Sequence, residues 1–321
     1  MSARVEQRLP PWLRRQVPRG EVAQRVNKVL HRWRVKAVCH SALCPNQHEC
    51  FSQGRLTFMI LGDKCTRHCA FCNITKGKPA PVDASEPERI AAAAKELALS
   101  YVVITSVTRD DLADGGAKHF ARTVGAVRKL TPTEGVEVLI PDFQGLVSSL
   151  EVVIEARPSV LNHNVETVER LHPAIRPQAS YQRSLDVLRQ AKSLAKQASL
   201  TKSGLMLGLG ETYAEVVGVM EDLRAAGCDF LTIGQYLSPS PKHHRVVRYV
   251  PPEEFGHYQI IGQRMGFRGV ASGPLVRSSF GAQKLWESAA SKTMRDEGTG
   301  VTPQPGTHNR QSEDVDSPTW R

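Results

Sequence analysis

The chain has 321 residues, a formal net charge of +10 and few aromatic residues, 6% of the total. Its length permits one large barrel-type domain. It contains no long apolar run and no signal sequence, which excludes a membrane-spanning helix and predicts a cytoplasmic protein without a membrane partner. Seven cysteines in a reducing compartment indicate metal ligation or free thiols rather than disulfides.

The positive charge is concentrated at the N-terminus. Residues 1–36 contain ten lysines and arginines but only two acidic residues. The remainder is nearly balanced and cannot present the broad basic face of a nucleic-acid-binding domain, so no nucleic-acid partner is expected. The arm is either a solvated basic helix or a surface that steers an acidic partner. Pro10, Pro11 and Pro18 argue against an amphipathic transit peptide.

The first predicted helix starts at Glu21. Apolar residues recur every three or four positions on one of its faces, namely Val22, Val26, Val29, Leu30 and Trp33. Lysines and arginines occupy the opposite face. The helix leads directly to a group of cysteines.

These cysteines have the pattern Cys-x4-Cys-x5-Cys and are Cys39, Cys44 and Cys50. Pro45 and Asn46 interrupt any helix between them, which predicts a loop that turns its sulfurs inward onto a metal. Only three cysteines are present, and four ligands are needed for a closed zinc site. His40 and His48 are candidate fourth ligands, so zinc remains an alternative here.

A second group of cysteines follows the apolar segment 56–61 with the pattern Cys-x3-Cys-x2-Cys: Cys65, Cys69 and Cys72. The next cysteine, Cys228, is far away and is interpreted as a packing residue. Three thiolates leave one iron of a four-iron, four-sulfur (4Fe-4S) cluster open to a small molecule. This spacing, together with Phe71, resembles the signature of radical S-adenosylmethionine (SAM) enzymes. Zinc is again the alternative.

Apolar, β-branched segments alternate with amphipathic segments along the rest of the chain. Strands are predicted at 56–61, 101–107, 135–141, 160–164, 203–207 and 230–236, and helices at 87–99, 117–130, 146–156, 181–196, 213–226 and 252–265. This alternation predicts an α/β fold with a parallel sheet buried under helices. A partial (β/α)6 TIM-type barrel with an N-terminal helical and cysteine-loop extension fits better than an open sheet, which remains the alternative.

Four regions are expected: a basic arm with the first cysteine group (1–54), the barrel (55–270), a C-terminal element (271–286) and a disordered tail (287–321). In barrels, functional side chains follow the carboxyl ends of the strands. Asn162, Asn164 and Glu211 fall at such ends and are candidates for binding a cofactor.

The two cysteine groups and the segment Arg277-Ser278-Ser279 make the chain similar to the lipoyl synthase family. The similarity spans about residues 10–285 and includes the runs 58–65, 102–117, 162–168, 201–211 and 272–279. Phe280-Gly281 stands where the family usually has Tyr-His, and near Glu169 the family commonly has proline.

This resemblance implies a sulfurtransferase that uses SAM and two 4Fe-4S clusters to insert sulfur at carbons 6 and 8 of a protein-bound octanoyl-lysine. Cys65, Cys69 and Cys72 would hold the cluster that chelates SAM and generates a 5′-deoxyadenosyl radical. The other group, Cys39, Cys44 and Cys50, would hold an auxiliary cluster that donates sulfur. Ser279 would be its fourth ligand and the first to leave, with Arg277 as a neighbouring positive group.

The resemblance also implies partners. Octanoylated lipoyl carrier domains, such as the E2 subunits of 2-oxoacid dehydrogenases and the H protein of the glycine cleavage system, would bring the substrate. A flavodoxin or ferredoxin would supply electrons, and an iron-sulfur cluster carrier would rebuild the auxiliary cluster. The basic arm, including Arg14, Arg15 and Arg19, would steer acidic carriers.

Two other functions are compatible with parts of the pattern. One is a different two-cluster radical SAM sulfurtransferase similar to the tRNA methylthiotransferases, although only 64 residues precede Cys65. The other is a zinc-stabilised RNA-binding protein, which the low aromatic content and the balanced barrel disfavour.

Overall fold

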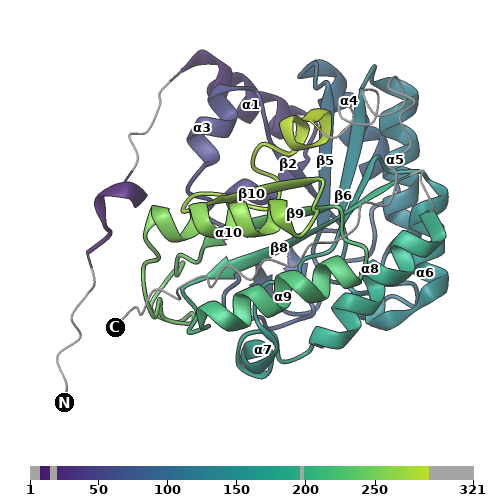
Figure 1. Cartoon of the computed structure of the whole chain (residues 1–321). Helices are drawn as coiled ribbons and strands as arrows, with labels where there is room; N and C mark the ends of the chain where they lie inside the picture. The colour runs from purple at the N-terminus through teal and green to yellow at the C-terminus, as the bar shows by residue number, and fades with distance from the viewer. Residues whose placement is uncertain (1–7, 15–19, 196–198, 289–321) are drawn as a thin grey trace, which may run out of the picture.

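The computed structural model describes residues 8–14, 20–195 and 199–288. One sheet of eight strands has the order β1-β2-β5-β6-β7-β8-β9-β10 (Figure 1). Every pair from β2 to β10 is parallel, and β1 is antiparallel to β2. Among the described residues, the edge strands β1 and β10 do not pair with each other, so the barrel is open between them.

All six predicted strands are confirmed. They are β2 (Thr57–Ile60), β5 (Tyr101–Ser106), β6 (Gly135–Leu139), β7 (Val160–Asn162), β8 (Leu200–Leu207) and β9 (Phe230–Gln235). Two edge strands, β1 (Lys36–Ala37) and β10 (Gly269–Gly273), were not predicted. The segment that forms β10, Gly-Val-Ala-Ser-Gly, has a single large apolar side chain, so it lacks the signal of a buried strand.

The six predicted barrel helices are also confirmed, with ends shifted by a few residues. They are α4 (Glu86–Glu96), α5 (Ala117–Leu130), α6 (Val147–Glu155), α8 (Tyr181–Ala195), α9 (Tyr213–Ala225) and α10 (Pro252–Arg264). Figure 1 shows them outside the sheet. Side chains of β2, β5, β6 and β9 are almost entirely buried, which is why these strands read as continuous apolar runs. A short α7 (His172–Ile175) follows β7.

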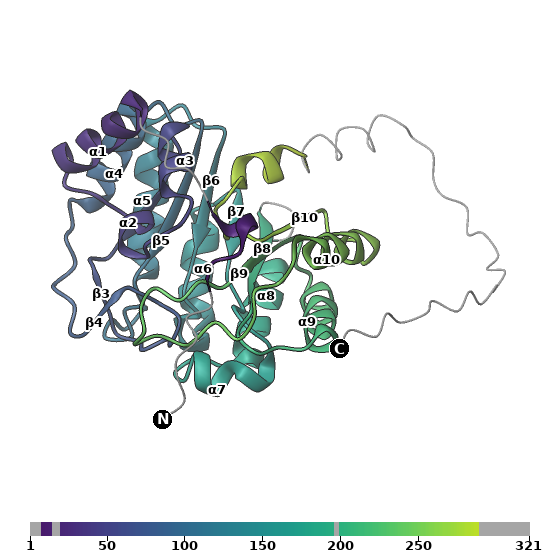
Figure 2. The same ribbon diagram turned by 90° about the vertical axis from the view of Figure 1, so that its left-hand side faces the viewer.

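In the first cysteine group the predicted helix break at Pro45 and Asn46 is confirmed and Cys44 lies in it, but the loop is short and the other two cysteines lie in helices on either side. Cys39 lies in α2 (Val38–Ser41) and Cys50 in α3 (Gln47–Ser52), with the turn at Pro45 between them. The proline only separates two helical turns. Helix α1 (Glu21–Arg32) begins where predicted and packs on α3 and α4. Figure 2 shows α1, α2 and α3 beside α4 and α5 on one flank.

The C-terminal segment crosses to the same flank. The Asn46 side-chain amide donates to the Leu275 carbonyl at 2.5 Å, and Gln283 donates to the Ser100 hydroxyl at 3.1 Å. The Trp286 ring packs on Tyr101. These contacts place the C-terminal segment between α3 and the amino end of β5. Apart from residues 287 and 288, the predicted tail lies outside the described residues.

Among the described residues no helix is both long and apolar enough to cross a bilayer. Cys228 is fully buried, and its thiol donates to the Phe230 carbonyl at 3.1 Å. Its interpretation as a packing residue is confirmed.

Candidate metal centres

The second cysteine group lies in a loop tied to the barrel by one arginine. The loop is bracketed by the two-residue strands β3 (Lys64–Cys65) and β4 (Thr75–Lys76). The Arg67 guanidinium, with 4% of the side chain exposed, donates two hydrogen bonds to Asp110 at 2.7 and 2.8 Å. It donates a third to Asp142 at 2.6 Å. The two aspartates follow β5 and β6, so the strand ends fix the loop.

This ion-pair cluster is buried. Burial by itself raises the pKa of Asp142, but the hydrogen bonds and charge of Arg67 outweigh it and hold that pKa well below its ordinary range. The pKa of Asp110 is lowered in the same way, with burial opposing Arg67. The Arg67 backbone N–H also donates to the Cys65 sulfur at 3.4 Å. The backbone hydrogen bond to Cys65 and the ion pairs of Arg67 therefore both fix the loop.

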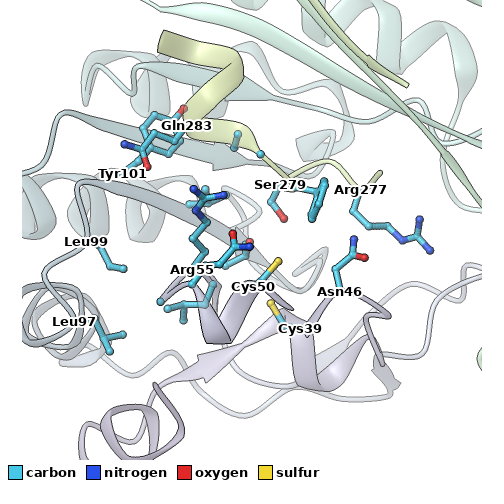
Figure 3. Close-up of a pocket in the computed structure, with 18 of the residues that line it drawn as sticks. Cys39, Asn46, Cys50, Arg55, Leu97, Leu99, Tyr101, Arg277, Ser279 and Gln283 are labelled. Carbon is cyan, nitrogen blue, oxygen red and sulfur yellow. The ribbon is translucent and has the colours of Figure 1, made fainter. Parts of the chain in front are cut away.

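The first cysteine group and Ser279 surround a separate cavity of about 330 Å³, which we call the amino-end cavity. Figure 3 shows the Cys39 and Cys50 sulfurs directed toward the Ser279 hydroxyl from the opposite wall. Cys44 and Arg277 line the same cavity, as do Phe280 and Gly281, where the chain departs from the family pattern. The donor set is thus three thiols and one hydroxyl.

This donor set fits an iron-sulfur cluster. Burial raises the pKa of the Cys39 thiol to about 11 and that of the Cys72 thiol to about 12. Such thiols are protonated at neutral pH until a metal neutralises the thiolates. Among the described residues, no three His, Cys, Asp or Glu side chains are close enough to hold a single ion. The ligands of a 4Fe-4S cluster lie farther apart than those of a single ion, because each binds a different iron of the cluster.

A second cavity connects the two cysteine groups. It has a volume of about 410 Å³ and is lined by Cys39 and Cys44 from one group and by Phe71 and Cys72 from the other. We call it the reaction chamber. The two groups are therefore neighbours, and the Asn73 amide directly links their segments by donating to the Ser41 carbonyl at 2.8 Å.

Only one of the three predicted cofactor-binding residues lines the reaction chamber. Asn164 lines the reaction chamber, and its amide donates to Glu166 at 3.0 Å and to the Ser278 hydroxyl at 2.6 Å. Asn162 is turned toward Glu137, at 3.2 Å. The Glu211 carboxylate accepts the backbone N–H groups of the turn that precedes it, at 2.6 to 3.1 Å. Asn162 and Glu211 do not line the chamber.

Sequence reasoning missed Glu166 as a site residue. It lines the reaction chamber in a left-handed backbone conformation, with φ of 67°, which a residue with a side chain adopts only when its surroundings impose it. Burial raises the pKa of its carboxyl, opposed by the charge of Arg176. Its position two residues after Asn164, at a strand end, was the available signal.

The candidate histidine ligands of the first group lie elsewhere. His40 packs edge-on against Phe51, with ring centroids 5.1 Å apart. Neither His40 nor His48 is among the residues lining the amino-end cavity or the reaction chamber. Ser279 from the other end of the chain lines both.

The fold and the cysteine loop define a class of enzymes. Residues 59–223 match the model of the radical SAM superfamily. The fold is also similar to that of the FeFe-hydrogenase maturase HydG from Carboxydothermus hydrogenoformans. That match has a TM-score of 0.54 and 12% sequence identity, and covers 84% of this chain and 68% of that one. This chain is a radical SAM protein with a TIM-type partial barrel.

Closer relatives identify the family. Lipoyl synthase of Caldicellulosiruptor saccharolyticus is 51% identical over 280 residues, which covers 87% of this chain and 98% of the relative. Lipoyl synthases of Caldanaerobacter subterraneus and Oleidesulfovibrio alaskensis are each 53% identical, covering 86% of this chain and 96% and 94% of their own lengths. The chain belongs to the lipoyl synthase family. It is accordingly a sulfurtransferase of lipoate biosynthesis that uses SAM and two 4Fe-4S clusters and acts on a lipoyl carrier protein.

Proposed function

We propose that sulfur is inserted at carbons 6 and 8 of a carrier-bound octanoyl chain inside the reaction chamber. The observation that carries this proposal is that residues of both cysteine groups, Cys39 and Cys44 on one side and Cys72 on the other, line this single cavity. A carbon radical formed at one group can therefore reach the other without leaving the protein. A zinc-stabilised RNA-binding protein provides no reason for this arrangement, whereas another two-cluster sulfurtransferase would share it and is set aside by the identity to lipoyl synthases.

Each cysteine group has its own task in this proposal. Cys65, Cys69 and Cys72 hold the cluster that binds SAM, and Cys39, Cys44 and Cys50 hold the auxiliary cluster. When bound, the SAM-binding cluster would supply the electron that cleaves SAM and so starts hydrogen abstraction from an unactivated carbon. The auxiliary cluster would supply sulfur. Arg67 positions the SAM-binding loop through Asp110 and Asp142.

The walls of the chamber orient the ligands. Asn164 and Glu166 lie where they can donate to and accept from the polar groups of SAM, and Glu166 is positioned by the Asn164 amide. Apolar wall residues such as Leu205, Met206 and Leu139 provide a surface for an alkyl chain. Asn162 and Glu211 support these walls from outside the chamber.

Ser279 and Arg277 have roles at the auxiliary site. We assign Ser279 as the fourth ligand, because its hydroxyl faces the Cys39 and Cys50 sulfurs (Figure 3). A hard oxygen ligand suits this thiolate and sulfide environment poorly and is the first to leave. The Arg277 guanidinium donates to the Val276 carbonyl at 2.7 Å, and burial lowers its pKa while the thiol of Cys44 opposes that shift. Its charge offsets the negative charge of the site.

The assignment is tested by removing one cysteine group at a time. We expect Cys65→Ala/Cys69→Ala/Cys72→Ala to lose half of the iron and all SAM cleavage. Cys39→Ala/Cys44→Ala/Cys50→Ala should also lose half of the iron but still cleave SAM reductively, without forming a C–S bond. Anaerobic iron and sulfide analysis, with assays for 5′-deoxyadenosine and lipoyl product, measures both. Colourless wild-type protein containing stoichiometric zinc would contradict the assignment.

The carrier partners are a further part of the proposal. We propose that the octanoyl group arrives on E2 subunits or on the glycine cleavage H protein, with electrons from a flavodoxin or ferredoxin and new clusters from an iron-sulfur carrier. The basic arm, 1–36, is suited to steer acidic carrier domains. Arg15 and Arg19 lie outside the described residues.

Neutralising the arm tests this steering. In Arg14→Gln/Arg15→Gln/Arg19→Gln, the apparent KM for an octanoylated carrier domain should rise at low salt, because the electrostatic attraction is weaker. The KM for a short, uncharged octanoyl-lysyl peptide should not change and serves as the control. Equal changes for both substrates would exclude steering by the arm.

A further inference from the structure

The auxiliary cysteine site can be approached from two sides. The reaction chamber lies toward the carboxyl ends of β7, β8 and β9, where Asn164, Met206 and Gln235 line it. The amino-end cavity lies beside the amino ends of β2 and β5, where Thr57 and Tyr101 line it. Four residues line both cavities, namely Cys39, Cys44, Arg277 and Ser279. The auxiliary site thus separates the two spaces.

The amino-end cavity has no part in binding SAM as assigned above. Its lining includes all three auxiliary cysteines and Ser279, but none of the cysteines of the SAM loop, nor Asn164 or Glu166. In barrels of this kind, chemistry takes place at the carboxyl ends of the strands, while the amino ends serve stability. The inner part of this cavity, between the cysteines and Ser279, is the auxiliary site itself, but its extension to the exposed residues Gln53 and Arg55 needs its own explanation.

The charge of this cavity favours anions. Its described lining contains two arginines, Arg55 and Arg277, and no aspartate or glutamate. Arg55 is exposed at the surface, and Figure 3 shows its side chain extending into the cavity between Tyr101 and Ser279. A guanidinium at an aqueous opening raises the local concentration of anions and speeds their entry. Neutral groups, including Leu97, Leu99 and Gln283, form the rest of the opening.

We propose that the amino-end cavity is the port through which an anionic, thiolate-ligated 4Fe-4S cluster refills the auxiliary site. The inference rests on the proposed function, because an enzyme that consumes cluster sulfide must replace it. Entry from the amino ends leaves the reaction chamber free for SAM and the acyl chain. Transfer is a ligand exchange without electron transfer. Thiols of Cys39, Cys44 and Cys50 bind iron and pass their protons to the departing donor thiolates, and the Ser279 hydroxyl does the same.

Cluster transfer can be measured at the auxiliary site alone. In the full-length Cys65→Ala/Cys69→Ala/Cys72→Ala background, bound iron reports only that site. A synthetic 4Fe-4S complex with four small thiolate ligands, which is a dianion, is the probe. The transfer rate is followed anaerobically from bound iron after rapid desalting and from the visible spectrum.

Two changes at the port should slow transfer. Gln53 is exposed and lines the amino-end cavity, so Gln53→Trp narrows the opening and should slow filling several-fold. Arg55→Glu should slow it about tenfold at low salt, Arg55→Lys should restore most of the rate, and both differences should shrink at high salt. The matched control is Leu43→Trp, because Leu43 is 60% exposed and lines only the reaction chamber. This control should fill at the parent rate.

Two sets of transfer rates would contradict the proposed port. Slowing by Leu43→Trp but not by Gln53→Trp, or unchanged rates in Gln53→Trp and Arg55→Glu, would place entry elsewhere. Repeating the measurement with a cluster-loaded carrier protein identifies the source. If the port variants slow transfer from both the synthetic complex and the carrier protein, both donors use the port. If they slow transfer from the synthetic complex alone, the port serves low-molecular-weight clusters. Because the readout is bound iron, the result stands whether or not the wild type forms lipoyl product.

Discussion

The two cysteine groups are built by opposite means. The cysteines proposed to hold the SAM-binding cluster come from one short loop, Cys65 to Cys72, fixed by a buried arginine between two aspartates. The auxiliary ligands come from two distant parts of the chain, α2 with α3 and the segment around Ser279. Neutral hydrogen bonds join these parts to each other and to the barrel, including Asn46 to Leu275 at 2.5 Å and Asn164 to Ser278 at 2.6 Å.

This difference agrees with what each group is proposed to do. Removing one partner of a buried neutral hydrogen bond costs about 1–3 kcal/mol, whereas removing one partner of a buried ion pair costs about 3–5 kcal/mol. The SAM cluster works in every turnover and is held by the stronger arrangement. The auxiliary cluster is consumed, and its ligands lie on segments that can separate at smaller cost. The following predictions test this contrast.

The largest effect is expected for Arg67→Met. It leaves Asp142, whose side chain is fully buried, without its closest cation, so the free energy of unfolding of the apo protein should fall by about 3–5 kcal/mol. Arg183→Met is the matched control. Arg183 also contacts Asp142, at 3.3 Å, but is 37% exposed, so its loss should cost about 1 kcal/mol or less. Urea unfolding measures both.

Iron analysis separates the two sites in the same variant. Because Arg67 lies between Cys65 and Cys69 and anchors their loop to Asp110 and Asp142, Arg67→Met should lose the SAM cluster first and keep the auxiliary one. Equal loss of both clusters, or equal destabilisation by Arg67→Met and Arg183→Met, would show that the two sites are not held by different forces.

A pH effect of intermediate size is expected on the SAM side. His163 is fully buried, and its ring nitrogens lie 3.0 Å from the Ile140 carbonyl and 3.1 Å from the Ser184 hydroxyl. Burial, together with the charge of Arg176, lowers its pKa from 6.5 to about 4. The unfolded chain therefore takes up a proton below pH 6.5 that the folded chain does not. Stability is lost as the pH falls from 6.5 to 4, by about 3 kcal/mol from this group.

The variant His163→Gln isolates this contribution. It should be less stable than the wild type at pH 7, but its stability should fall less steeply between pH 6.5 and 4. Urea unfolding of the apo proteins at several pH values measures the two slopes, and contributions from other groups cancel in their difference. Parallel curves would show that His163 is not the titrating group.

Ser279→Cys is expected to have the smallest effect on stability. Its effect on the loss of iron from the auxiliary cluster should be clear. A thiolate suits iron better than a hydroxyl oxygen, so the fourth ligand should no longer leave first. Iron release during a single turnover, measured with a ferrous chelator, should decrease and product should fall with it, while SAM cleavage continues. The unfolding free energy should change by less than about 1 kcal/mol. Unchanged iron release with full product would exclude Ser279 as the release point.

Local patterns accounted for most of the fold. The strands and helices of the barrel were predictable because apolar strands such as Tyr101–Ser106 and amphipathic helices such as Ala117–Leu130 carry their periodicity in the sequence. The edge strand Gly269–Gly273 was not, because among its small residues only Val270 has a large apolar side chain and the strand is defined by its backbone pairing with β9. The same closeness appears at Gly234, where a Cβ atom would lie 2.0 Å from the Val276 carbonyl.

The chain sequence by itself determined which residues can bind iron, since cysteine spacing is a local property. It also determined the family, since long runs of sequence are shared with lipoyl synthases. Tertiary structure alone decided which polar residues at the strand ends line the reaction chamber. Asn164 and Glu166 line the reaction chamber, whereas Asn162 and Glu211 are turned to other partners. Side-chain direction at a strand end depends on the neighbouring strands and turns, and the sequence of one strand does not contain them.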